Sequence, residues 1–568
     1  MIEDPLDADD EAPPPRRRWL IITVLGVLAF GIAVATLSLR GGPGGALGCD
    51  VQEWAARVGL SGPRHEPSQV IVLVAAFADD PAGAMQQRLL GAFDNSRGLR
   101  PLRTCRVLGA SGVAPRDAAA ALRQQRRADA LLWGEVQPDG EAIIWVSATA
   151  EPPATWSPLR LGTLAAAPAL HAGLAEVARV MVLSSIPAPD ERAQRTLAEA
   201  LAERLPPVER ILTAPLAELD PASRRSLAWV VANGAARLGE LRGDAVQLRR
   251  AVGLYLQLRS GPLAAAPADL QAVQVSLGRA YLALSALDGT SNAGVDAITA
   301  FRAALTAAER QGSTIATIQV REALADALLA AGLRQGSLAG IEEAAGLYRA
   351  ALTPELRQTA PARWGEMQMR LGTALAELGT RSKDPTQLEA ALPPLRAALE
   401  VRTREADPLA WAATQNRIGR ALLALGEARD DKARLEEAVA TFRLALRDAA
   451  RDRAPLAWAE TQYDLGRALM ALGQRETGMA LLNEAEGTFN NALLVRRREQ
   501  VPALWAETRE ALARLGLDLA ARGGGKTRLV QARADAEAAR DEYRRLRNAT
   551  AAQRAEQLRD RISLEIEL

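Results

Sequence analysis

The chain of 568 residues contains few of the residues on which active sites and metal sites usually depend. Its only histidines are His65 and His171, and histidine is the usual general base near neutral pH. Its only cysteines, Cys49 and Cys105, cannot make a metal site alone; in an oxidising compartment they could pair or remain two free thiols. We therefore expect no catalytic residues, no metal and no cofactor, and predict that the protein is not an enzyme.

Lysine is also scarce, occurring only at positions 383, 432 and 526, so arginine carries nearly all the positive charge. The chain has 69 basic and 68 acidic residues, a formal net charge of +1. Such a balance produces no global field that would attract nucleic acid, so we expect no nucleic-acid partner. The segment Gly523–Thr527 is not a phosphate-binding loop, because Ala520 stands where a glycine is required and no strand precedes it.

Tryptophans recur at one fixed interval in the carboxy-terminal half. Trp364, Trp411, Trp458 and Trp505 are each 47 residues apart, and a proline stands three residues before each of them. A second series with the same interval has alanine at 297, 344, 391, 438 and 485, and a large apolar residue four positions after each alanine. Equal spacing on this scale indicates a repeat protein with two helices in each unit.

One unit illustrates the expected hairpin. From Trp411 onward, apolar residues follow a helical spacing, Pro408 suits the first turn, and Asp407 is a natural N-cap. We expect Gly426 to end this helix and a second helix to begin near Leu435.

This pattern resembles the tetratricopeptide repeat, in which small residues allow close helix contact and an aromatic residue fills the hairpin. The resemblance rests on Ile418-Gly419, Leu422, Ala438, Phe442 and Ala445, and covers about residues 226–550, or about seven units. The unit is longer than that family's usual one, and the tryptophan lies one turn earlier. The resemblance implies a mainly α fold, a right-handed superhelical α-solenoid of hairpins over residues 190–525, followed by capping helices over residues 526–568.

In that family the first helices line a concave groove that binds protein or peptide partners, and two series of side chains point into it. The position after the helix glycine holds Arg279, Asp326, Thr373, Arg420 and Arg467, and Arg514 occupies the matching site of the last unit. Asn416 and Tyr463, three positions before that glycine, could hydrogen-bond an extended backbone. The resemblance thus implies a partner-binding groove formed by Arg279, Asn416, Arg420, Tyr463, Arg467 and Arg514. An acidic segment of the partner would lie on the arginines. The alternative is that these arginines pair with nearby glutamates of the chain itself.

An uncharged run precedes these repeats. Trp19–Leu39 comprises 21 residues, enough to cross a hydrocarbon core of about 30 Å at about 1.5 Å per residue. Three arginines precede the run and only Arg40 follows it, so the positive-inside rule places the acidic tail, residues 1–18, in the cytoplasm. We expect an uncleaved membrane anchor at 19–39, a linker at 40–67 and everything beyond on the outer side, in the periplasm if the host is bacterial. A cleaved signal peptide is the alternative.

Residues 68–187 have a different periodicity, typical of a small α/β domain. Strands are expected at Val70–Phe77, Ala130–Val136 and Ala142–Ala148, the last two as a hairpin, with a possible edge strand at Thr104–Leu108. Helices are expected between the earlier strands. The arrangement around Asp129–Gly134 resembles the amino-terminal domain of TolB, which implies binding and not catalysis. Asp79 and Asp80 could hold a cation, although a loop or N-cap role suits them better.

We therefore predict a membrane-tethered scaffold that binds a protein or peptide partner. One alternative is an envelope sensor whose α/β domain binds a small ligand. Another is the accessory subunit of an enzyme.

Overall fold

The computed structural model describes residues 70–80, 83–94, 99–108, 113–137, 142–148, 159–161, 171–188, 191–213, 221–260, 269–288, 292–448 and 451–567. These residues form two compact units that divide after Ala293. The expected tail, anchor and linker, and with them His65 and Cys49, lie outside the described residues. Within the described part, no helix combines the length and the apolar character needed to cross a membrane.

The first unit contains a five-stranded sheet. Its strands are β1 (Val70–Ala76), β2 (Leu99–Val107), β3 (Ala130–Val136), β4 (Ala142–Ser147) and β5 (Leu159–Leu161), in the order β2-β1-β3-β4-β5. β1 is parallel to β2 and β3, because α3 (Ala84–Asp94) and α4 (Val113–Gln125) provide the crossovers. β3, β4 and β5 are antiparallel. The predicted α/β region, its edge strand and its hairpin are confirmed, whereas β5 is an element that the sequence did not reveal.

The core of the sheet explains its strand sequences. Ile71 and Leu73 of β1 pack with Trp133 of β3 beneath Ala119 and Leu122 of α4. Trp133 and Trp145 pair across the hairpin, with their ring centroids 6.3 Å apart. Asp80 accepts hydrogen bonds from the backbone N–H groups of Ala84 and Met85, so this aspartate caps α3.

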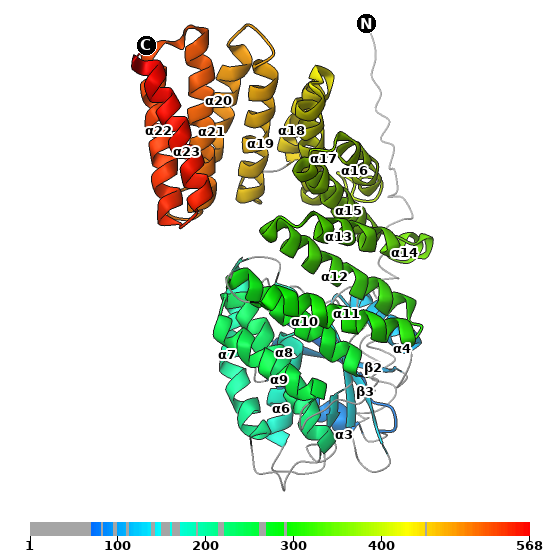
Figure 1. The fold of residues 1–568 in the computed structure, drawn as a ribbon. Coiled ribbons are helices and arrows are strands. Elements are labelled where there is room, and N and C mark those ends of the chain that lie inside the picture. The colour runs from blue at the N-terminus through cyan, green and yellow to red at the C-terminus, as the bar shows by residue number, and fades with distance from the viewer. Residues whose placement is uncertain are drawn as a thin grey trace, which may run out of the picture. The chain divides into compact units, whose positions relative to one another are not determined.

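Helices complete the first unit (Figure 1). They are α6 (His171–Leu183), α7 (Glu191–Leu212), α8 (Pro221–Arg242), α9 (Ala245–Ser260) and α10 (Leu270–Leu287). α6 packs on α3, α7 and α8, and α8 also contacts β5. The helix α8 therefore contacts the sheet directly at β5, and α6 links α8 to α3.

The second unit is a series of helical hairpins. After α11 (Ala293–Arg310), its pairs are α12 (Thr314–Gln335) with α13 (Leu338–Ala351), α15 (Pro361–Ser382) with α16 (Pro385–Ala398), α17 (Pro408–Arg429) with α18 (Lys432–Asp448), and α19 (Pro455–Gly473) with α20 (Ala480–Leu493). A last pair, α21 (Pro502–Leu519) and α22 (Gly525–Arg545), is followed by α23 (Ala549–Glu567). A short helix, α14 (Pro354–Thr359), precedes α15. A mainly helical, hairpin-repeat fold is thus confirmed.

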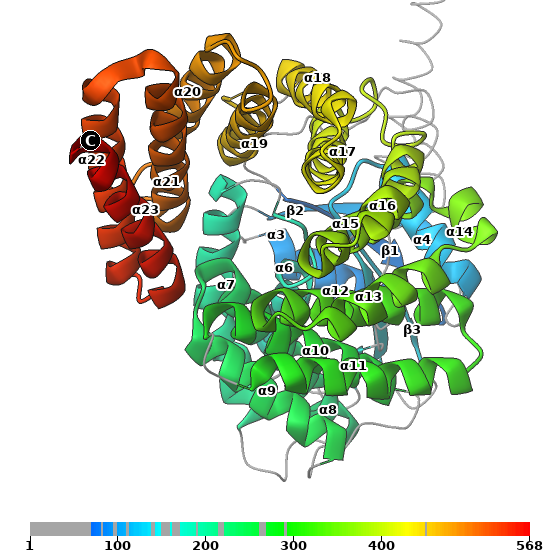
Figure 2. The same ribbon diagram turned by 45° about the horizontal axis from the view of Figure 1, so that its top comes forward.

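The 47-residue interval is visible in the helix starts. α12, α15, α17, α19 and α21 begin at residues 314, 361, 408, 455 and 502. Asp407 caps α17 by accepting from the Ala410 N–H group, as predicted, and proline occupies the first turn of the last four of these helices. Figure 2 shows these hairpins following a curved path, with α15, α17, α19 and α21 along its inner side.

Two predicted helix boundaries were wrong. α17 passes through Gly426 and continues to Arg429, and α18 begins at Lys432, before Leu435. A Cβ atom on Gly426 would lie 2.7 Å from Leu435 Cδ2, so this glycine serves close helix packing instead of termination. The turn itself is made by Asp430, whose φ of 52° places it in the left-handed region.

Candidate functional site

The first helices of successive hairpins are α15, α17, α19 and α21, and they lie along the inner side of the curved path of hairpins. The side of these helices that faces the inside of the curve is the candidate surface of the second unit, and we call it the inner face. Neighbouring first helices contact one another directly in the pairs α15 with α17, α17 with α19, and α19 with α21. Side chains can therefore form contacts from one repeat to the next along this face.

Arg420 lies on the inner face between two repeats. Its guanidinium is 3.4 Å from Glu377 Oε1 on α15 and 3.3 Å from Glu460 Oε1 on α19. The side chain is still 34% exposed. Because both contacts are long and single, they leave part of the five-donor guanidinium available to another acceptor.

The next two arginines of the predicted series are also paired. Arg467 lies 3.8 Å from Glu427 on α17, near the limit of an ion pair. Arg514 donates to Glu510 at 2.6 Å, and the same carboxylate receives a two-point contact from Arg554 of α23. Burial would raise the pKa of Glu510, but the hydrogen bonds from Arg554 and Arg514 hold that pKa below its usual value.

The two predicted polar residues are engaged inside the repeat stack. Asn416 is only 5% exposed and donates to Thr461 Oγ1 and Asp464 Oδ2, both at 3.2 Å. Tyr463 packs its ring against Phe489, and the Arg496 guanidinium lies 4.4 Å from the ring centroid. The Asn416 amide links α17 to α19, so we do not count it among the side chains available to a partner.

A charge cluster that the sequence reading missed lies nearer the start of the unit. Arg370 of α15 contacts Asp326 at 2.5 Å, Glu322 at 3.2 Å and Glu366 at 3.0 Å. The Tyr348 hydroxyl donates to Asp326 at 2.5 Å. Burial raises the pKa of Asp326, although Arg370 and Tyr348 favour its charged form. The signal in the sequence was an acidic residue 44 positions before Arg370, close to one repeat length.

The inner face therefore carries both charge signs in alternation. Carboxylates of one repeat face the guanidinium groups of the next, as the contacts of Arg370, Arg420 and Arg467 show. Arg420, Arg467 and Arg514 are each paired with a glutamate, as the alternative in the sequence analysis expected. Their role in partner binding stays a prediction.

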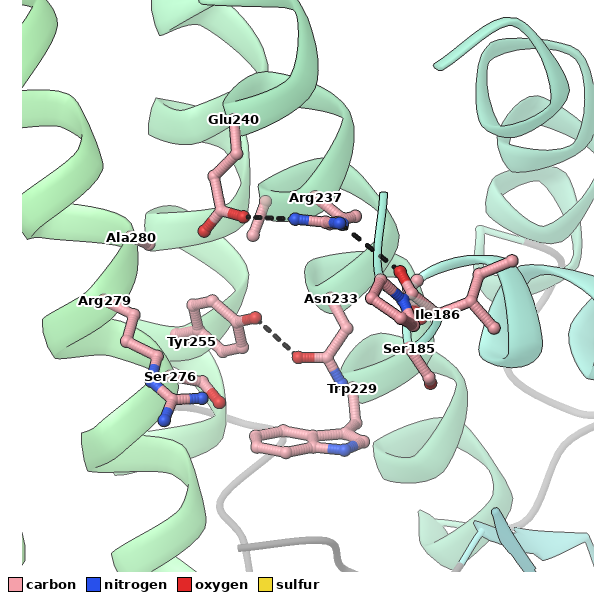
Figure 3. Close-up of a pocket in the computed structure, with 13 residues that line it drawn as sticks. Ser185, Ile186, Trp229, Asn233, Arg237, Glu240, Tyr255, Ser276, Arg279 and Ala280 are labelled. Carbon is pink, nitrogen blue, oxygen red and sulfur yellow. Dashed lines mark hydrogen bonds and ion pairs between the residues drawn. The ribbon is translucent and has the colours of Figure 1, made fainter. Parts of the chain in front are cut away.

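Arg279 has a different setting, in a pocket of about 280 Å³ within the first unit. The pocket lies between the segment after α6 and the helices α8, α9 and α10, and its lining includes Ser185, Trp229, Arg237, Tyr255 and Arg279. Figure 3 shows the Trp229 indole on one side of Tyr255 and Arg237 on the other, with Arg279 reaching in from α10. The sequence did not reveal this pocket, because its residues come from four separate segments.

Hydrogen bonds hold the wall of this pocket. The Tyr255 hydroxyl donates to Asn233 Oδ1 at 2.7 Å, and its ring meets Trp229 edge-on at 5.8 Å. Arg237 reaches Glu240 Oε2 and the Ile186 carbonyl, each at 3.3 Å, and so ties the segment after α6 to α8. Burial raises the pKa of Tyr255, so its hydroxyl stays protonated as a donor.

Across the residues that the structure describes, no group of three or more His, Cys, Asp or Glu side chains could hold a metal ion. α6 begins at His171. Gly523 and Gly525, both with positive φ, form the tight turn between α21 and α22, and Lys526 lies within α22.

Comparison with known proteins gives little beyond the helical architecture. No family model matches the sequence, and no curated protein is significantly similar to it. Similar solved structures include a Rap protein complexed with competence and sporulation factor, at 13% identity over 69% of this chain and 98% of that chain, with a TM-score of 0.38. The apo form of RapI matches at 12% identity over 69% and 98%, with a TM-score of 0.40.

A third similar structure is a circular tandem repeat protein of novel repeat topology, at 15% identity over 69% of this chain and 94% of that chain, with a TM-score of 0.24. Scores at this level say nothing about function. None of these findings bears on the resemblance of the α/β region to TolB.

Proposed function

We propose that this protein is a non-enzymatic scaffold, tethered to a membrane through Trp19–Leu39, that binds a protein or peptide along its inner face. The observation that carries the proposal is the ladder of Arg420, Arg467 and Arg514, which stand on three successive first helices at the same position of the repeat. Such a ladder offers an extended chain one contact per repeat.

The geometry of the ion pairs supports this use. Arg420 and Arg467 make long contacts of 3.3 to 3.8 Å with glutamates of neighbouring helices. Exposed pairs of this kind are worth only about 0–1 kcal/mol, so a partner carboxylate can share or replace them at small cost. Arginine suits the task because its planar fork matches carboxylates. The proposed partner segment is therefore acidic.

The test begins with affinity purification from detergent extracts, using the full chain and a chain without residues 190–568. The partner thus found is then offered to a variant with Arg420, Arg467 and Arg514 changed to Gln. We expect this variant to keep its helical circular dichroism and to lose the partner, and the interaction of the parent to weaken with salt.

A matched control is available on α11, α16 and α18. Arg302, Arg396 and Arg443 each reach a glutamate 41 residues further on and are exposed, so changing these three to Gln removes the same charge elsewhere. This control should still bind. Binding that survives in the inner-face variant, or that is lost equally in the control, refutes the inner face as the site.

The tethering has its own test. A reporter fused after Leu568 should be active as exported alkaline phosphatase, because the arginines before Trp19 favour the cytoplasmic side. Fluorescence from an ordinary green fluorescent protein at the same position would contradict this topology, and with it the proposed periplasmic location.

A sensor function is the second candidate, and the pocket around Arg279 is the observation that favours it. That pocket lies beside the helices α8 to α10 and not at the strand ends of the α/β region. A ligand there would contact both the segment after α6 and the first repeat helices.

A further inference from the structure

We propose that the pocket around Trp229 and Arg279 binds a monoanionic carboxylate attached to a flat apolar group. This inference goes beyond the scaffold proposal, because the pocket lies in the first unit and shares none of its residues with the ladder of Arg420, Arg467 and Arg514.

The cation of the pocket is Arg279. It is exposed, and among the described residues no carboxylate lies within ion-pair distance of it, whereas Arg420, Arg467 and Arg514 each have such a neighbour. The same repeat position thus holds a paired arginine in three hairpins of the second unit and an arginine without a carboxylate partner here. A guanidinium in a pocket, with its donors unused by protein carboxylates, is suited to an incoming one.

The apolar part of the ligand has a surface to rest on. Trp229 lines the pocket and is held edge-on to Tyr255, which is itself fixed by its hydrogen bond to Asn233. A flat group can pack against the indole in an offset or edge-on arrangement. An apolar cavity of about 150 Å³ is enough for benzene, so about 280 Å³ has room for a ring, its carboxylate and some water.

The charges around the pocket select a single negative charge. Its lining contains Arg237, Arg279 and Glu240, and Glu240 already neutralises Arg237 at 3.3 Å. One positive charge therefore remains without a partner, and a carboxylate of charge −1 neutralises it. A phosphate dianion would bring a second negative charge close to Glu240, which repels it.

The polar side chains of the pocket offer hydrogen-bond donors to the carboxylate of the ligand. Asn233 Oδ1 is occupied by the Tyr255 hydroxyl, so its amide group can only donate to a further partner. The hydroxyls of Ser184 and Ser185 donate to the Met181 carbonyl, which makes them poor donors to a ligand. Arg279 and Asn233 are therefore two donors that the pocket can offer to the carboxylate.

The experiment uses the full chain in detergent and ligand-observed nuclear magnetic resonance titrations. The probes are phenylacetate, its neutral isostere phenylacetamide, and inorganic phosphate. We expect phenylacetate to bind and the other two to bind at least about tenfold more weakly, as a charge-assisted hydrogen bond implies. Arg279→Met should weaken phenylacetate binding by a similar factor, and Arg279→Lys should restore part of it.

The control is Arg259→Met, which removes an exposed arginine at the end of α9 that does not line the pocket. It should bind phenylacetate like the parent. Equal binding of phenylacetamide, tighter binding of phosphate, unchanged binding by the folded Arg279→Met variant, or no binding of phenylacetate at millimolar concentration would each overturn the proposal.

A final arm separates the two sources of such a carboxylate, a free aromatic acid and the carboxy-terminal residue of a protein. A short peptide ending in phenylalanine is compared with the same peptide amidated. Competition with phenylacetate by the free acid alone identifies a chain terminus. Phenylacetate binding without competition by either peptide identifies a small molecule. Competition by both peptides equally would overturn recognition of the carboxylate.

Discussion

An arginine covers each of the four repeat tryptophans. Arg357, Arg404, Arg451 and Arg498 precede the tryptophans by seven residues, and their guanidinium carbons lie 4.8, 5.8, 5.7 and 5.3 Å from the ring centroids. Each contact connects the segment before a first helix to the start of that helix. A cation over an exposed ring contributes about 0.5–1 kcal/mol, so each arginine–tryptophan contact adds a small stabilisation to its repeat.

The tryptophans are not equally buried, and their replacement should show it. Trp364 is 7% exposed, whereas Trp458 is only half-buried. We expect Trp364→Ala to cost about 3–5 kcal/mol and Trp458→Ala clearly less, because the cost follows the packing lost. Hydrogen exchange should show the loss of protection centred on α15 and α19 respectively. A Trp458→Ala variant that is damaged as much as Trp364→Ala would contradict this order.

Asp464 gives a prediction for pH. Burial raises the pKa of this carboxyl, and Arg420 and Arg467 offset the shift only in part. The folded state therefore binds a proton more readily than the unfolded chain, and the stability from this group falls as pH rises from about 3.9 through the folded pKa.

Asp464→Asn should consequently melt at a higher temperature than the parent near neutral pH, since it keeps an acceptor for Asn416 without the buried charge. The difference should shrink in acid. Thermal melts followed by circular dichroism across pH test this, with Asp541→Asn, at an exposed position of α22, as the control. A parent that melts higher than Asp464→Asn at pH 7 would show that the charged form is needed.

Glycines set how closely the two helices of a hairpin approach. A Cβ atom on Gly419 would lie 2.6 Å from Phe442 Cε1, and one on Gly466 would lie 2.7 Å from Phe489 Cε1. The aromatic residue of the second helix therefore packs directly on the glycine of the first. This contact explains why small and aromatic residues recur with the same interval.

Two glycine substitutions in one hairpin should act in opposite directions. Gly466→Ala gains helix propensity but forces Phe489 aside, so we expect a net loss of about 1–3 kcal/mol. Gly487→Ala in α20 meets no atom within 4 Å and should stabilise by about 0.5–1 kcal/mol. Chemical denaturation of both variants decides the matter. Stabilisation by Gly466→Ala would mean that the two helices have room to separate.

The last hairpin is closed by α23. Ala551, Ala552 and Ala555 of that helix are buried against Ala506 and Tyr543 of the preceding pair, and Arg554 pairs with the buried Glu510. Removing α23 would expose this apolar surface and leave Glu510 with fewer partners.

Each repeat contacts mainly its neighbours, so the damage from such a truncation should stay local. A chain ending at Arg547 should lose hydrogen-exchange protection in α21 and α22, and α12 and α15 should remain protected. Full-length protein under the same conditions is the reference. Uniform loss of protection along the second unit would indicate a single cooperative block.

The apolar spacing and the 47-residue repeat were enough to predict the hairpins from the sequence. A helix is a local structure, and the fixed interval places equivalent helix faces in register. The strand pairing of β3 and β4 followed in the same way from two short apolar runs and a turn signal. The small element β5 escaped, since three residues carry too little pattern.

The sequence alone also placed an arginine at the same position of several repeats. Only the tertiary structure decided which of these charges are compensated, because an ion pair depends on residues about one repeat away, such as Glu377 for Arg420. The same holds for Asn416, which became a buried link to Asp464. The pocket of Arg279 depends on packing four segments together, and the distances among those segments are set by the fold and not by their order in the chain.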